Sequence, residues 1–108
     1  MGLVVAPIVD GKVEAWKSWT AEFSGPRKND FEDLNQRYGL TRHDIWFAES
    51  PAGPMAVVVH EGPGADTFMQ KIAQSDHSFD VSMKQQIESF HGMNLGEPPP
   101  GPMPVKMI

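Results

Sequence analysis

The chain has 108 residues and a mass of 12.0 kDa, which suits a single domain and leaves no room for a second independent core. Nine Lys and Arg residues against 14 Asp and Glu residues give a formal charge of −5, and this balance argues against nucleic acid as a partner, since phosphate binding depends on Lys and Arg. The sequence has no cysteine, which excludes disulfides, thiolate nucleophiles and cysteine-ligated metal sites. Neither an apolar run of the roughly 20 residues that a membrane helix needs nor an N-terminal signal pattern is found, so we expect a cytoplasmic protein without a membrane partner.

The first part of the chain predicts one strand followed by two helical segments. The apolar, β-branched run over residues 3–9 ends at a turn pair, which is typical of a strand. Apolar residues then recur at helical spacing over residues 13–23, and Ser24-Gly25-Pro26 interrupts them. Pro26 suits the first position of a second helix, and Gly39 suits a left-handed stop at its end.

The second part predicts a hairpin and another interrupted helix. Two apolar runs, at residues 45–48 and 55–59, flank the turn-forming segment 50–54. A helical pattern follows at residues 68–73, breaks at a group of capping residues, and resumes over residues 79–90. The order is therefore β-α-β-β-α, with each helix broken once.

This order predicts an α+β fold with a ferredoxin-like split β-α-β unit and an antiparallel sheet. The domain is expected to span residues 1–95. Residues 96–108 form a proline-rich C-terminal tail, which favours an extended polyproline conformation. A fourth strand of the sheet could come only from residues 104–108.

The predicted strands are apolar on both faces, whereas a sheet with one face in water alternates apolar and polar residues. The neighbouring apolar pairs are Val4–Val5, Trp46–Phe47 and Val57–Val58. The helices of so short a chain cover one side of the sheet, so we expect the other side to pack against a second copy. The alternative is that the tail folds back over the sheet. A homodimer is the predicted state.

Element order and two-sided strands resemble the dimeric α+β barrel superfamily, in which two ferredoxin-like subunits pack sheet to sheet. The superfamily includes small antibiotic-biosynthesis-type monooxygenases, haem-degrading enzymes and many uncharacterised domains, and the chain is similar to an uncharacterised branch. The resemblance covers roughly residues 1–95. It implies a homodimer with an apolar cleft for a small organic molecule, and it carries over no functional residue.

A candidate site lies on the hairpin. If residues 51–53 form a three-residue loop, Asp44 lies beside His60 on the sheet face opposite the helices. An Asp fixes the tautomer of a neighbouring His and raises its basicity, which suits a general base. This face would also carry a substrate-binding wall of Trp46, Ala48, Ala56 and Val58.

A loop with an even number of residues would bring His43, another candidate for substrate binding, to His60 instead. Two histidines could bind a metal, but a third ligand with recognisable spacing is missing. The structural alternative is that Asp44 and His60 form a satisfied polar pair. Of the other candidates, His91 is interpreted as a cation at a helix C-terminus, His77 as a solvent-facing residue, and the two tryptophans at 16 and 19 as packing residues.

Two functions remain open at this point. The first is a cofactor-free monooxygenase-like enzyme, in which His60 removes a proton from the substrate, Asp44 orients His60, and Trp46 forms the pocket wall. The alternative is a non-catalytic ligand-binding or structural dimer whose tail holds its partner. Standard nucleotide and metal motifs are absent from the sequence, so no bound cofactor is predicted.

Overall fold

A computed structural model of the chain describes residues 2–92, 104–105 and 107–108. Its elements are β1 (Gly2–Pro7), α1 (Val13–Ala21), a 3-10 turn η1 (Glu22–Ser24), α2 (Lys28–Arg37), β2 (Arg42–Ser50), β3 (Gly53–Glu61), α3 (Phe68–Ala73) and α4 (Ser78–His91). The predicted α+β class and element order are confirmed, including the break in each helical stretch. None of the described helices is long and apolar enough to cross a membrane.

The sheet has the strand order β1-β3-β2, and both neighbouring pairs are antiparallel. β1 and β2 therefore run parallel to each other with β3 between them, which is compatible with a ferredoxin-like split β-α-β unit. Three strands form the sheet in the described part of the chain. The described residues between 104 and 108 are not in a strand, and most of the predicted tail lies outside the described residues.

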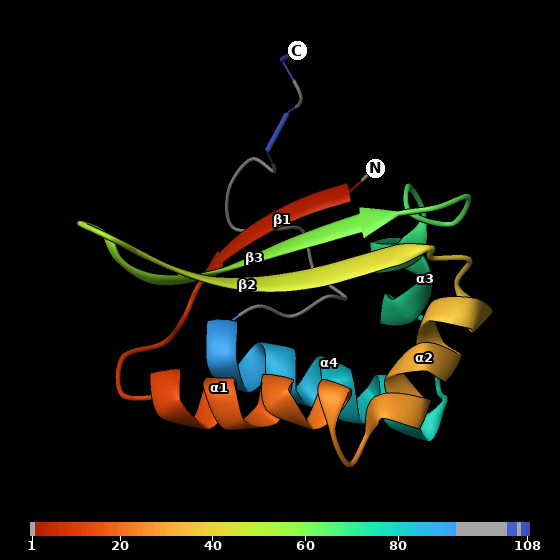
Figure 1. Cartoon of the computed structure of the whole chain (residues 1–108), viewed down its shortest axis with the longest axis horizontal. Helices are drawn as coiled ribbons and strands as arrows, with labels where there is room; N and C mark the ends of the chain where they lie inside the picture. Colours follow the sequence, from red (N-terminus) through yellow and green to blue (C-terminus); the bar gives the residue numbers. More distant parts are fainter. Residues whose placement is uncertain (1, 93–103, 106) are drawn as a thin grey trace.

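All the helices lie on one side of the sheet, which gives the molecule two layers (Figure 1). Alternate residues of β1, such as Val4 and Ala6, are buried towards the helices, while Val5 is 41% exposed on the other face. The buried residues form two clusters between the layers. One centres on Leu34, Phe68 and Ile72, and the other on Ile8, Trp16 and Phe90.

The hairpin does not have the register that the predicted Asp44–His60 site requires; it has the alternative register. Ser50 pairs with Gly53, so only Pro51 and Ala52 lie between the paired residues. The Ser50 hydroxyl closes this loop, because it accepts from the Ala52 amide at 3.1 Å and donates to the Gly53 carbonyl at 3.1 Å. The two-residue loop shifts β3 by one position relative to β2, and such a shift moves its side chains to the opposite face.

As a result, the predicted Asp44–His60 pair is wrong. Asp44 pairs with Val59, and its carboxylate accepts a hydrogen bond from Arg42 on the face away from the helices. His60 pairs with His43 across the two strands. A charged guanidinium and water at the sheet edge stabilise the Asp44 carboxylate, which the apolar layer around His60 cannot do.

A close backbone approach locks the end of α2 against the loop after β3. Gly39 ends the helix with a φ of 67°, as predicted, and its carbonyl accepts from the Gly64 amide at 3.0 Å. A side chain on Gly64 would meet the Tyr38 carbonyl oxygen at 1.7 Å, so only glycine fits there. This contact places the start of β2 next to the end of β3, and so brings His43 and His60 together.

A buried carboxylate joins the second helix to the last one. Asp80, in the first turn of α4, is fully buried and accepts two hydrogen bonds from Arg37, at 2.9 and 2.7 Å. It also accepts one from the Tyr38 hydroxyl at 2.6 Å and one from the Ser75 hydroxyl at 2.7 Å. All its partners are protein groups, so the Asp80 cluster is a structural anchor.

Candidate functional site

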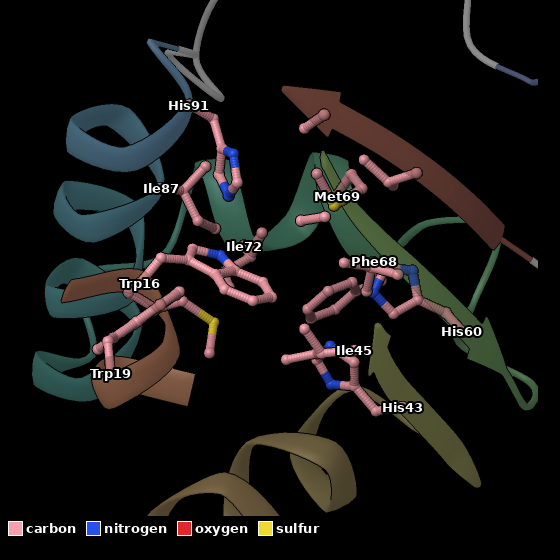
Figure 2. Close-up of a pocket in the computed structure, with 15 residues that line it drawn as sticks. Trp16, Trp19, His43, Ile45, His60, Phe68, Met69, Ile72, Ile87 and His91 are labelled. Atoms are coloured by element: carbon pink, nitrogen blue, oxygen red, sulfur yellow. The ribbon is translucent and has the colours of Figure 1, made fainter. Parts of the chain in front are cut away.

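A cavity of about 70 Å³ lies between the sheet and the helices. A single water needs roughly 10–15 Å³ of such space, so the cavity has room for several water-sized groups or one small organic molecule. Figure 2 shows side chains from both layers pointing into it. The wall consists of Val4, Ala6, Trp16, Trp19, His43, Ile45, Ala56, Val58, His60, Phe68, Met69, Ile72, Met83, Ile87 and His91.

His43 and His60 form the polar part of the wall on the sheet. They project from directly paired positions, and their ring centroids lie 4.7 Å apart at an interplanar angle of 64°. Aromatic rings enclose them, because Phe31 lies 4.7 Å from His43 and Phe68 lies 4.7 Å from His60. Asn35, near the end of α2, contacts His43 through Oδ1 and Nδ1 at 2.8 Å.

This enclosure keeps both rings uncharged. Burial, together with the neighbouring His60, lowers the pKa of His43 from its usual 6.5 to about 3. Burial also lowers the pKa of His60 to about 4. At neutral pH each ring therefore offers one hydrogen-bond donor and one acceptor.

A third imidazole, His91, enters the cavity from the end of α4 (Figure 2). Its Nδ1 lies 2.8 Å from the carbonyl oxygen of Pro7, which can only accept a hydrogen bond. Burial lowers the pKa of His91, so the ring is uncharged at neutral pH. The prediction of a cation at the helix end is therefore wrong in its charge, although His91 does lie in the last turn and Gly92 ends α4 in the left-handed conformation.

The rest of the wall is apolar and comes mainly from helices. Trp16 and Trp19 of α1 lie across from the histidine pair, and Phe68 and Ile72 of α3 close the space behind it. Within residues 2–92 and the described part of the C-terminus, no Lys, Arg, Asp or Glu lines the cavity. Among the described residues there is also no group of three potential ligands that could hold a metal ion. The arrangement is suited to an uncharged, mostly apolar molecule with a few hydrogen-bonding groups.

The predicted site residues divide between the two faces of the sheet. The cavity brings together His43, His60, Ala56 and Val58. Asp44, Trp46 and Ala48 lie on the opposite face, where Trp46 pairs with Val57 and is 59% exposed. The one-residue shift of β3 accounts for this division. It turned the predicted site residues of β3 towards the helices and left Asp44, Trp46 and Ala48 of β2 on the face opposite the helices.

Sequence reasoning missed the helical part of the wall. Trp16 and Trp19 were interpreted as packing residues, and Trp16 is indeed buried, but both also border the cavity. For His91, the only indication in the sequence was its position in the last turn of the predicted helix. The exposed His77 caps α4 instead, where its Nδ1 accepts from the Phe79 amide at 3.2 Å.

A groove of about 410 Å³ runs beside the cavity, between β2 and the segment from α1 to α2. Trp16, His43 and Ile45 belong to the walls of both hollows, so these three side chains separate them. Lys17 lies over the Phe47 ring in this groove, 4.4 Å from its centroid. The groove therefore brings the molecular surface close to the enclosed pair of His43 and His60.

In comparisons with known proteins, no protein-family model, curated protein or solved structure matched the chain. The resemblance to the dimeric α+β barrel superfamily therefore stays a prediction, and what the site does has to be inferred from its own chemistry.

Proposed function

We propose that the chain binds a small, uncharged organic molecule in the cavity between sheet and helices. The observation that carries this proposal is the composition of the wall, which consists of apolar and aromatic side chains and three uncharged imidazoles. An ordinary core would fill this space with side chains, since voids lower stability. Here the space is kept open beside groups that can form directional hydrogen bonds.

Filling the cavity tests this function. Val58→Phe adds a ring to a wall position on β3, and we expect it to abolish binding of indole, used as a probe, in calorimetric titration. Val9→Phe is the matched control, because Val9 is 39% exposed and is not part of the wall. Unchanged indole affinity in folded Val58→Phe, or no binding to the wild-type chain, would contradict the proposal.

A second candidate is proton transfer in the manner of a cofactor-free monooxygenase, and the Asn35–His43 contact favours it. The amide oxygen accepts from Nδ1–H, which leaves the lone pair of His43 on Nε2, ready to take a proton. Because the pKa of His43 is only about 3, it is a weak base and requires an acidic substrate proton. Oxygen uptake with a panel of acidic phenols and enols would test this, and His43→Gln should abolish it.

We also infer that two copies pair through the open face of the sheet, as in a dimeric α+β barrel built from ferredoxin-like subunits. Most of this face is apolar, because it carries the directly paired residues Leu3–Val59, Val5–Val57–Trp46 and Met55–Ala48, with the charged Asp44 beside Val59. Exposed apolar surface of this kind marks an interaction site. Each fully buried large side chain would contribute about 1.5–3 kcal/mol.

Trp46→Glu tests the dimer, because it puts a charge in the middle of that face. We expect the wild-type chain to sediment at twice its 12.0 kDa mass and Trp46→Glu to sediment as a monomer. Lys28→Glu, on the exposed side of α2, is the control and should remain dimeric. A wild-type monomer at micromolar concentration would contradict the inference.

A further inference from the structure

The hydrogen bond of His91 defines which chemical group a ligand should present to it. The Pro7 carbonyl accepts at 2.8 Å, so the Nδ1 of His91 carries the proton. In an uncharged imidazole the other nitrogen, Nε2, then has the lone pair and is an acceptor. The tautomer is held by the backbone of β1 and does not depend on a mobile side chain.

The position of His91 makes this acceptor relevant to a ligand. The ring lies at the α4 end of the cavity, while His43 and His60 lie at the sheet, with Ile72 and Ile87 in the region between (Figure 2). A molecule in the cavity would therefore meet an acceptor at one end, an apolar middle, and two further imidazoles at the other end. A ligand that covers this acceptor without donating to it would leave it unpaired, which is costly and gives the cavity a preference among ligands of equal shape.

Charge is the second criterion. Among the residues that the structure describes, no Lys or Arg lines the cavity, and the imidazoles resist protonation because they are buried. The indole rings of Trp16 and Trp19 carry no charge, so they do not neutralise an anion. A carboxylate would lose its hydration without gaining a counter-charge, which disfavours its entry.

We propose that the cavity selects neutral molecules that carry an N–H or O–H group, which donates to Nε2 of His91. This inference rests on the proposed binding function and adds the ligand class: heterocycles with an N–H group and small alcohols of similar size, in preference to ethers, hydrocarbons and carboxylates of the same shape.

Three probes of similar size separate these classes at pH 7: indole, which has an N–H donor; benzofuran, which has the same shape without one; and benzoate, which is an anion. We expect indole to bind at least about tenfold more tightly than benzofuran, the value of one unpaired buried acceptor, and benzoate to bind most weakly. If none of the probes binds, the proposed function fails. If indole and benzofuran bind equally, or benzoate binds as well as indole, binding stands and the ligand class is wrong.

A second test changes His91. His91→Phe keeps a ring at the position but removes the acceptor, and it should bind indole and benzofuran with equal affinity. In the wild-type chain, the ¹⁵N signal of Nε2 of His91 should move when indole is added and stay in place with benzofuran. This measurement does not depend on whether the variant folds. An unmoved signal at indole saturation would overturn the proposal.

Discussion

The chain buries polar groups in two regions, which differ in charge and in how their hydrogen-bonding groups are satisfied. Asp80 is charged, and every interaction that holds it comes from the protein: Arg37, Tyr38 and Ser75. His43 and His60 are uncharged and border open space. Hydrogen bonds from Arg37, Tyr38 and Ser75 lower the pKa of Asp80 even though burial opposes this, whereas burial is the main reason that the histidines are uncharged.

This difference distinguishes a structural polar cluster from a functional one. A buried charge is tolerated when partners replace its hydration, and a fully partnered group has nothing left to offer a ligand. Uncharged imidazoles beside a cavity still have donor and acceptor capacity.

Removing Asp80 should have the largest effect. Asp80→Ala leaves the Arg37 guanidinium, the Tyr38 hydroxyl and the Ser75 hydroxyl without their shared acceptor, and we expect a loss of about 3 kcal/mol in the free energy of unfolding. Urea denaturation monitored by tryptophan fluorescence measures this loss. A change below about 1 kcal/mol would show that the cluster is not an anchor.

Acid should act on the histidine pair before it acts on Asp80. The folded-state pKa of His60, about 4, lies below its unfolded value of 6.5, so the unfolded chain binds more protons and stability falls as the pH drops from 6.5 towards 4. We expect His60 alone to contribute a loss of roughly 2 kcal/mol between pH 7 and pH 5.

The contribution of Asp80 has the same sign but acts at lower pH: its pKa is lowered on folding, so its stabilisation is complete above pH 3.8 and is lost only below that value. Urea denaturation across pH 4–7 separates the two regions. His60→Gln should make the pH dependence shallower, with His43 and His91 supplying the remainder, and a wild-type slope in this variant would contradict the assignment.

Asn35→Ala tests the hydrogen bond at the edge of the histidine pair. Loss of the 2.8 Å contact to Nδ1 of His43 should cost about 1 kcal/mol of stability. The ¹⁵N signals of the His43 ring should then show a mixture of tautomers where the wild-type chain shows one. Retention of a single tautomer would mean that another group orients the ring.

The smallest effect is expected at the exposed end of the Asp80 cluster. Asp33 accepts from Nε of Arg37 at 2.8 Å, but its side chain is 55% exposed. Asp33→Ala should therefore change the free energy of unfolding by less than about 0.5 kcal/mol. A loss close to that of Asp80→Ala would show that the Arg37 network acts as one unit.

Local sequence patterns could predict most of the elements but only part of the site. The break at Ser24-Gly25-Pro26 and the stop at Gly39 could be predicted, because proline fixes φ and glycine adopts positive φ without steric cost, whatever surrounds them. The Asp80 cluster was not readable, since its partners Arg37 and Asp80 are 43 positions apart and no local pattern links them. The position of His91 at a helix end could be predicted, but its contact with Pro7 could not, because the two residues lie at opposite ends of the domain sequence.

The order of strands and helices, the α+β class and the apolar character of both sheet faces could be predicted, because each depends on residues close together in the chain. The register of the hairpin was decided only in the tertiary structure. Since β3 is apolar on both faces, a shift of one position buries about as much apolar surface either way, and the pattern cannot choose between them. Two tertiary features stabilise the register that places His60 beside His43. One is the two-residue loop closed by the Ser50 hydroxyl, and the other is the contact between Gly39 and Gly64.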